Sequence, residues 1–412
     1  MSEMPQNPPR PAPVTLGRRA RRALEYGAGI GMAVPRTIAF AGESWLRSRV
    51  GNGSPGTPRL SAGLLAQVAL DEIVIAAMKT PGRFPRRADY ETASREMQAA
   101  YELFRERGWD GDPSTYHVAP PPPDDLTVSS GLWMGAGWQH VRFSSGFEPF
   151  VEDEARARWL DFKPNSTMHA WIKRHADRDA PWVICVHPYG TGRSLVSGFM
   201  FRANDLAEDL GVNVALVVLP LHGTRGAGVW STTAFMTYNP VDFLLGLTQS
   251  VWDVRRFMAW LRQTGGGPIA LYGLSLGAHV SATIVGLDAE LAGVVAGVPT
   301  CDLLDVFLRH VPKRLRPRAI EHKLIGDETR AMLKVTSPLT FPPLIPRERL
   351  AIFAGTGDRM SPPDQAMALW KHWGEPELRW FDVNHTAFMW SAEINDFVRR
   401  SLRSILAPPL AA

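Results

Sequence analysis

Apolar residues fall into short runs along the last two-thirds of the chain, and turn-forming residues stand between the runs. Eight runs have the length or the alternation of strands, and helical patterns separate most of them. They are 139–147, 167–174, 182–186, 212–219, 269–272, 291–298, 350–354 and 378–383. Short strands alternating with helices are typical of a parallel sheet that is buried on both faces. The pattern therefore predicts an α/β fold with a doubly wound, mostly parallel eight-stranded sheet, whose first two strands form an antiparallel edge.

The first third of the chain has a different pattern. Residues 1–58 combine a proline-rich start, for which we predict disorder, with a basic arm and a glycine/proline linker. Residues 59–135 form a predicted helical extension, with helices over 61–79 and 88–108. The sequence thus predicts an α/β domain over 136–412, preceded by an arm and a helical extension.

Two charged features of this first third bear on membrane contact. The helix expected over 61–79 carries Asp71 and Glu72 inside an apolar run, which predicts a packed helix and not a membrane span. The arm is basic through Arg18, Arg19, Arg21 and Arg22. We interpret the arm as packing against the body of the protein, with weak peripheral contact to an anionic membrane surface as the alternative.

Composition narrows the class of protein further. Hydrophobic residues make up 45% of the 412 residues and charged residues 21%, which is ordinary for a soluble globular protein. The net charge of +4 is mild, and basic and aromatic residues are not interleaved, so nucleic acid is not an expected partner. Cys185 and Cys301 both lie in or just after apolar runs, which predicts free buried thiols and a cytoplasmic protein, with membrane association as the alternative. No spacing of cysteine and histidine suggests a metal site.

One motif carries candidate chemistry. The run 269–272 leads into Gly273-Leu274-Ser275-Leu276-Gly277 and then into a helix of small residues. This is G-x-S-x-G between a strand and a helix, the context in which a sharp turn exposes a nucleophilic serine. The amide of Leu276, at the start of the helix, is placed to stabilise a developing oxyanion.

The partners that such a serine needs follow later strands. Asp358 comes after the run 350–354, and His385 comes after 378–383. Functional groups gather at the carboxyl ends of strands in a doubly wound sheet, so both side chains are expected at the same edge as Ser275. Asp302 and Asp382 are the alternatives for the acid, and alternation along the strand disfavours Asp382.

This order of serine, aspartate and histidine resembles the α/β-hydrolase superfamily, in its serine esterase and lipase-like members, over residues 138–407. The resemblance implies that Ser275 is the nucleophile, His385 the general base and Asp358 the acid that orients the imidazole. A further likeness, to the α/β-hydrolase domain 18 type, rests on the Gly-Thr-Gly at 190–192, on Pro-Leu-His-Gly-Thr-Arg at 220–225 and on His385-x-x-Phe388.

The loop after the third strand would supply a second oxyanion donor. It reads His187-Pro188-Tyr189-Gly190-Thr191-Gly192 and resembles the His-Gly type of oxyanion loop, with Pro188 in place of the usual glycine. Because proline has no amide hydrogen, the donor is expected to be Tyr189, with Gly190 as the second choice. His187 is interpreted as a brace for this loop.

An insertion at about 301–345 separates the sixth and seventh predicted strands and exceeds a normal connection. In the superfamily that the chain resembles, such an insertion covers the nucleophile as a lid. An amphipathic helix is expected around Phe307 and Leu308, and we predict that these two side chains contact the acyl part of a substrate.

Together these features predict a serine hydrolase that cleaves a carboxylic ester through an acyl-enzyme. The substrate is expected to be a small-molecule ester or acyl compound, and the reaction needs no cofactor. An acyltransferase or a thioesterase could use the same three residues, and a non-catalytic binding protein could keep the same fold.

Overall fold

The computed structural model describes residues 27, 30–50, 56–78, 85–131, 134–226, 235 and 237–407. The segment 1–16 predicted to be disordered and the basic residues 18–22 of the arm lie outside these ranges, as does most of the predicted linker. The proposed membrane contact of the arm therefore stays a prediction.

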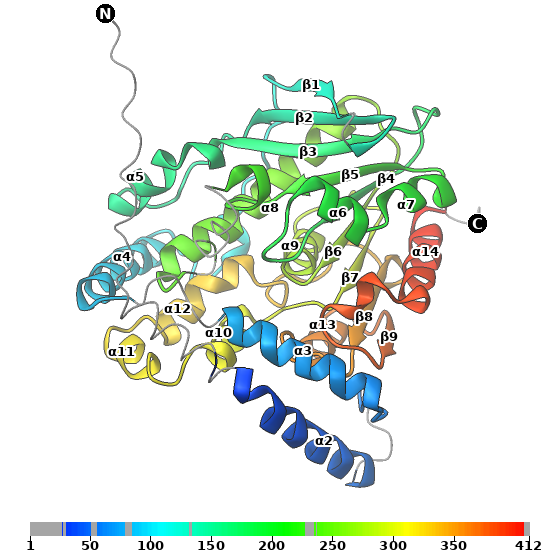
Figure 1. Ribbon diagram of the computed structural model, residues 1–412. Helices are drawn as coiled ribbons and strands as arrows, with labels where there is room; N and C mark the ends of the chain where they lie inside the picture. Colours follow the sequence, from blue (N-terminus) through cyan, green and yellow to red (C-terminus); the bar gives the residue numbers. More distant parts are fainter. Residues whose placement is uncertain are drawn as a thin grey trace, which may run out of the picture.

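The described residues form a sheet of nine strands in the order β1-β2-β3-β5-β4-β6-β7-β8-β9 (Figure 1). The strands are β1 (Thr127–Ser130), β2 (Trp138–Ser144), β3 (Thr167–Lys173), β4 (Trp182–Val186), β5 (Asn213–Val218), β6 (Ile269–Leu274), β7 (Gly293–Gly297), β8 (Leu350–Gly355) and β9 (Glu377–Phe381). The first four strands of this order pair antiparallel, and all pairs from β5–β4 to β8–β9 are parallel. The predicted fold class is confirmed, and the structure adds a ninth strand, β1, to the eight that were predicted.

Thirteen α-helices surround this sheet among the described residues. They are α2 (Ala33–Val50), α3 (Ala62–Met78), α4 (Arg87–Glu106), α5 (Glu154–Asp161), α6 (Ser194–Met200), α7 (Ala203–Leu210), α8 (Pro240–Gln263), α9 (Leu276–Val285), α10 (Leu303–His310), α11 (Arg316–Glu321), α12 (Asp327–Leu333), α13 (Pro363–His372) and α14 (Ala392–Leu406). Helices α10 to α12 lie between β7 and β8, in the segment predicted as an insertion, and its role as a lid stays a prediction.

The core has two layers because side chains along each strand alternate between the two faces of the sheet. On β4, Val183 and Cys185 join the core that includes side chains of α6, α7 and α14. Ile184 and Val186 join the core on the opposite face, under α4, α8, α9 and α13. The central strands are therefore buried on both faces, which holds their carboxyl ends at one rigid edge.

Helices α2 and α3 lie against the β8–β9 end of the molecule, at the bottom of Figure 1. Helix α3 begins after Ser61, whose Oγ accepts the N–H of Leu64 at 3.1 Å, as expected for an N-cap. Phe40 of α2 packs with Leu64 and Val68 of α3 in a small core of their own. Every helix among the described residues is too short or too polar to cross a bilayer.

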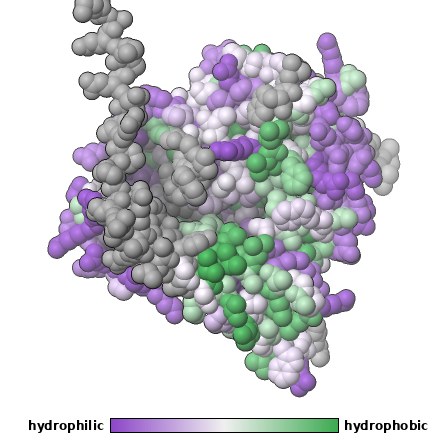
Figure 2. All heavy atoms as spheres, in the orientation of Figure 1, coloured by the Kyte–Doolittle hydropathy of each residue, from purple (hydrophilic) through white to green (hydrophobic). Residues whose placement is uncertain are grey.

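Some large apolar side chains remain at the surface. Figure 2 shows hydrophobic areas over α2 and α3 and a smaller one over α6. The exposed residues there include Val34 and Ile38 of α2 and Phe199 of α6.

Candidate active site

Ser275 lies in a sharp turn between β6, which ends at Leu274, and α9, which begins at Leu276. Its backbone has φ +52° and ψ −111°, a conformation that is rare for a residue with a side chain. The N–H of Ser275 donates to the carbonyl of Gly297 on the neighbouring strand at 2.9 Å, which fixes the turn against the sheet. The predicted strand–turn–helix context of the motif is present.

The two glycines of the motif allow this turn to pack closely. A Cβ at Gly277 would lie 1.9 Å from the carbonyl oxygen of Val186, at the end of β4. A Cβ at Gly273 would lie 2.3 Å from the carbonyl oxygen of Gly277. Strand, turn and helix therefore approach each other at a distance that no side chain permits at either position.

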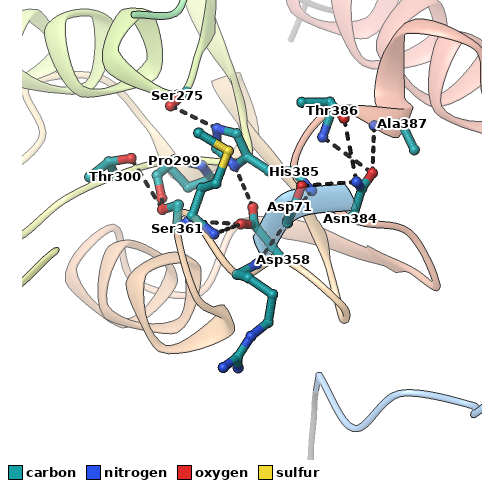
Figure 3. A network of polar contacts seen from close by, with 12 residues as sticks. Asp71, Ser275, Pro299, Thr300, Asp358, Ser361, Asn384, His385, Thr386 and Ala387 are labelled. Atoms are coloured by element: carbon teal, nitrogen blue, oxygen red, sulfur yellow. Dashed lines mark hydrogen bonds and ion pairs between the residues drawn. The ribbon is translucent and has the colours of Figure 1, made fainter. Parts of the chain in front are cut away.

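A chain of two hydrogen bonds joins Ser275, His385 and Asp358 (Figure 3). His385 Nε2 lies 3.0 Å from Ser275 Oγ, and His385 Nδ1 lies 2.6 Å from Asp358 Oδ2. All three side chains are buried, with 9% of Ser275, 6% of His385 and 2% of Asp358 exposed. The structure thus brings together the three residues that the sequence proposed as nucleophile, base and acid.

Asp358 is held in place by its own loop. Its Oδ1 accepts the N–H groups of Met360 at 2.9 Å and Ser361 at 2.7 Å, which leaves Oδ2 for His385. The alternative acids lie elsewhere. Asp302 caps α10, and Asp382 accepts hydrogen bonds from Thr356 and from the N–H of Arg59.

The surroundings of His385 favour its charged form. Burial lowers its pKa, but the Asp358 carboxylate, through charge and hydrogen bond, and the charge of Asp71 outweigh burial, so its pKa is raised above the ordinary value. Because Asp358 accepts at Nδ1, the neutral imidazole carries its proton there and presents the Nε2 lone pair to Ser275.

The loop after β4 is braced by His187. His187 Nε2 accepts the N–H of Leu219 at 3.1 Å, so Nδ1 carries the proton and donates to the carbonyl of Pro188 at 2.8 Å. Burial lowers the pKa of His187 to about 4, so the ring is neutral. In this loop Tyr189 is half-buried and Gly190, with φ +82°, is exposed. His187 therefore has the contacts of a structural residue.

No acceptor is found within the described ranges for the N–H groups of Tyr189, Gly190 and Leu276. Leu276 is the first residue of α9, where a helix leaves its N–H groups without an intrahelical acceptor. Within the described residues, all three predicted oxyanion donors are thus without a competing hydrogen bond.

The second loop that the sequence singled out, at 220–226, is structural as well. Arg225 is fully buried and donates to the carboxylate of Asp253 at 2.7 Å and to the carbonyls of Val218 and Asn165. These contacts tie the end of β5 to α8 and leave no charged group of Arg225 at the surface.

A second buried carboxylate, Asp71 of α3, lies behind the histidine (Figure 3). Its oxygens accept the N–H of Arg359, the N–H of His385 and the side-chain amide of Asn384. Burial and the neighbouring Asp358 raise the pKa of Asp71 to about 7. Sequence reasoning missed this residue as part of the site, although its one signal, a carboxylate inside an apolar helix, was visible.

Phe307 and Leu308, the two predicted substrate contacts, have different surroundings in the structure. Phe307 lines an apolar pocket between α4, α8 and the insertion helices, where its ring meets that of Tyr238 edge-on. Leu308 is half-buried and is not among the lining residues. Ser275, Asp358 and His385 do not line this pocket.

In the described part of the chain, no three histidine, cysteine or carboxylate side chains are grouped to hold a metal ion.

Comparisons with known proteins place the chain in a family. No family model matches it. Uncharacterized protein MT2702 of Mycobacterium tuberculosis (strain CDC 1551 / Oshkosh) is 34% identical over 371 residues, which cover 89% of this chain and 88% of the relative. Uncharacterized protein Rv2627c of Mycobacterium tuberculosis (strain ATCC 25618 / H37Rv) is 33% identical over the same length and coverage.

Among solved structures, an acetyl xylan esterase from Paenibacillus sp. R4 is similar with a TM-score of 0.49 and 14% identity, covering 78% of this chain and all of the esterase. The fold of this chain is assigned from its own strand order and from the turn at Ser275. The chain therefore belongs to the same family as the two mycobacterial proteins and has the α/β-hydrolase fold.

Proposed function

We propose that the protein is a serine hydrolase that cleaves a carboxylic ester, with Ser275 as nucleophile. The observation that carries the proposal is the buried hydrogen-bond chain from Ser275 Oγ through His385 to Asp358, at 3.0 and 2.6 Å. A hydroxyl becomes a useful nucleophile when a base within hydrogen-bond reach accepts its proton and a third group orients the base. Each of these conditions is met by a side chain of the site.

In the acylation half-reaction, Ser275 Oγ attacks the carbonyl carbon of the ester, and its proton passes to His385 Nε2. Asp358 stabilises the imidazolium that forms. The carbonyl oxygen becomes an oxyanion that accepts hydrogen bonds from the N–H groups of Leu276 and Tyr189, with Gly190 as the alternative to Tyr189. When the tetrahedral intermediate collapses, the C–O bond to the alcohol breaks and His385 gives its proton to the departing oxygen.

In the deacylation half-reaction, a water molecule takes the place of the alcohol. His385 removes a proton from this water while its oxygen attacks the acyl carbon on Ser275. The same N–H groups hold the second oxyanion. Collapse of this intermediate releases the carboxylic acid and returns the proton to Ser275.

A fluorophosphonate probe tests the proposal, because it reacts with an activated serine. We expect the native protein to be labelled and Ser275→Ala to be unlabelled. Ser250→Ala is a matched control, since Ser250 is also buried but donates to the carbonyl of Gly246 and contacts no residue of the site. Equal labelling of Ser275→Ala would show that another serine reacts, and a native protein that neither labels nor hydrolyses any ester would refute the hydrolase.

For the acyl group we propose the apolar pocket that Phe307 lines, which also includes Tyr238, Phe243 and Leu304. Apolar walls favour an acyl chain over a polar group. We expect Phe307→Ser to change the chain-length preference in a panel of esters. Leu308→Ser is the matched control, because Leu308 is its neighbour on α10 but does not line the pocket. Equal effects of the two variants, or no effect of either, would exclude this pocket.

A further inference from the structure

Helix α3 is joined to the site by a polar contact that the proposed reaction does not explain. We propose that Asp71 of α3 is a positioning residue that clamps the aspartate loop and the histidine loop together and places a second negative charge behind His385. The inference rests on the proposed function for its kinetic consequences, but not for its effect on the histidine itself. Helix α3 then belongs to the active site and is more than a cover over the sheet.

The clamp consists of three hydrogen bonds to one carboxylate. Asp71 Oδ2 accepts the N–H of Arg359 at 3.0 Å and the N–H of His385 at 3.1 Å, and Oδ1 accepts Asn384 Nδ2 at 2.8 Å. Arg359 directly follows the acid Asp358 in the chain. A single oxygen therefore fixes the backbone beside the acid relative to the backbone of the base, across the hydrogen bond that the reaction needs.

Neighbouring residues of α3 hold Asp71 in register with the histidine loop. Gln67, one turn earlier on the helix, accepts the N–H of Asn384 through Oε1 at 3.1 Å and accepts Asn384 Nδ2 through its carbonyl at 2.9 Å. Four acceptor atoms of α3, two of Gln67 and two of Asp71, thus converge on Asn384 and His385, so movement of the helix would move the histidine.

The aspartate loop is held by packing and by an ion pair. A Cβ at Gly357 would lie 2.6 Å from the Leu64 side chain and 3.1 Å from the Val68 side chain, so the loop backbone packs closely against these two side chains of α3. Glu72, next to Asp71, pairs with the guanidinium of Arg359 at 3.1 Å. Both loops of the site therefore contact the same helix face, and Asp71 is the residue that contacts both.

Asp71 affects His385 through its charge as well as through its hydrogen bonds. Asp71 is fully buried, and the charged groups around it are Asp358 and Arg359 of the aspartate loop, His385, Glu72 on its own helix and Arg36 of α2. Its ionised form raises the pKa of His385. Above about pH 7, where Asp71 is ionised, the imidazolium that forms when Ser275 attacks is stabilised by two carboxylates, of which only Asp358 bonds to the ring.

The substitution Asp71→Asn removes the charge and keeps the shape and one acceptor oxygen, and its amide nitrogen replaces one acceptor by a donor. The direct measurement is the pKa of His385, followed by NMR with ¹³C-labelled histidine and assigned by the signal that is lost in His385→Gln. We expect the pKa of His385 to fall by about half a unit in Asp71→Asn. We expect kcat for an ester to fall about tenfold in Asp71→Asn and about a hundredfold in Asp71→Ala, which releases both loops.

Glu96→Gln is the matched control. Glu96 is also a buried carboxylate with three hydrogen bonds, two from Arg158 and one from Asn239, but it contacts neither loop. We expect this variant to lose stability without a shift in the pKa of His385. A merely structural role of Asp71 would make the two variants alike.

The pKa of His385 and kcat together decide between the possible roles of Asp71. An unchanged pKa of His385 together with unchanged kcat in folded Asp71→Asn would overturn the proposal, as would an equal pKa shift in Glu96→Gln. If Asp71→Ala does not fold, Asp71→Asn still decides. A pKa shift of His385 in a protein that hydrolyses no ester would support the role of Asp71 and overturn only the proposed hydrolase activity.

Discussion

The turn at Ser275 and helix α3 contribute to the same site, the first through residues that are adjacent in the sequence and the second through residues that are far apart in it. The turn is built from five consecutive residues, and its geometry is set by the backbone of β6 and α9 and by the close approach of β4. Helix α3 reaches the site from far away in the sequence, since Asp71 and His385 are 314 residues apart. Ser275, the proposed nucleophile, is thus positioned by local backbone geometry, and His385, the proposed base, by tertiary contacts.

This difference has a consequence for how each part can fail. The turn lies in the doubly buried core, where a change of one methyl group forces strand and helix apart. The contact of α3 rests on hydrogen bonds and a small core of its own, so it can weaken while the sheet stays intact. Damage to the turn should therefore cost both stability and activity, and damage to α3 should act on activity through the histidine.

The largest effect is expected from Gly277→Ala. Its new Cβ would lie 1.9 Å from the carbonyl oxygen of Val186, so α9 must move away from β4 and carry Ser275 with it. We expect a loss of about 3 kcal/mol in the free energy of unfolding and a fall of kcat/KM of about a hundredfold or more. Denaturant unfolding and ester hydrolysis measure the two.

Gly42→Ala is the control for this substitution. Gly42 lies inside α2 with no atom within 4 Å of its added Cβ, so alanine there should raise helix stability by about 0.5–1 kcal/mol and leave kcat/KM unchanged. A Gly277→Ala protein with native stability and activity would show that the turn tolerates movement, and the contrast with α3 would disappear.

The same contrast explains what the sequence could predict. The turn and its two loops were predictable because β6 and β8 are contiguous apolar runs and β9 alternates between exposed and more buried side chains, and the residues after a strand lie at the sheet edge wherever the strand pairs. Strand β1 (Thr127–Ser130) was missed because all four of its side chains are exposed on an edge strand, so no apolar alternation marks it. Its pairing with β2 is made by the backbone, which the side-chain pattern does not record.

Asp71 was beyond sequence reasoning for another reason. A carboxylate in an apolar helix must find hydrogen bonds when it is buried, so the sequence predicts that a partner exists. It does not say which of the many N–H groups of a 412-residue chain is the partner. The docking of α3 against the β8–β9 end of the sheet decides that, and only the folded structure contains it.

A middle-sized effect is expected from pH. The proposed reaction needs neutral His385, and the carboxylates of Asp358 and Asp71 raise its pKa above the ordinary value of about 6.5. The acidic limb of kcat/KM should therefore have its midpoint above pH 6.5, with activity falling about tenfold per unit below it. A midpoint at or below pH 6.5 would show that the two carboxylates do not raise the pKa of His385.

Stability should change in the opposite direction over the same pH range. A histidine whose pKa is raised in the folded state stabilises that state while it is protonated, so this contribution is present below about pH 6.5 and is lost as pH rises through the folded pKa. The raised pKa of Asp71, about 7, has the same sign, because the folded state again binds its proton more tightly than the unfolded chain does. Thermal unfolding at pH 6 and pH 8 measures this loss.

The smallest effect is expected from Arg36→Ala, which tests whether the contribution of α3 extends to α2. Arg36 pairs with Glu72 at 3.2 Å, but its side chain is 37% exposed, and Glu72 keeps its second partner Arg359 when Arg36 is removed. Solvent screens such a pair, so we expect a loss below about 1 kcal/mol in the free energy of unfolding and an unchanged pKa of His385. Unfolding and the same histidine NMR titration as for Asp71→Asn check both. A pKa shift of His385 as large as that in Asp71→Asn would mean that His385 responds to the docking of α2 and α3 as a unit. The positioning role would then belong to this docking and not to the carboxylate of Asp71 alone.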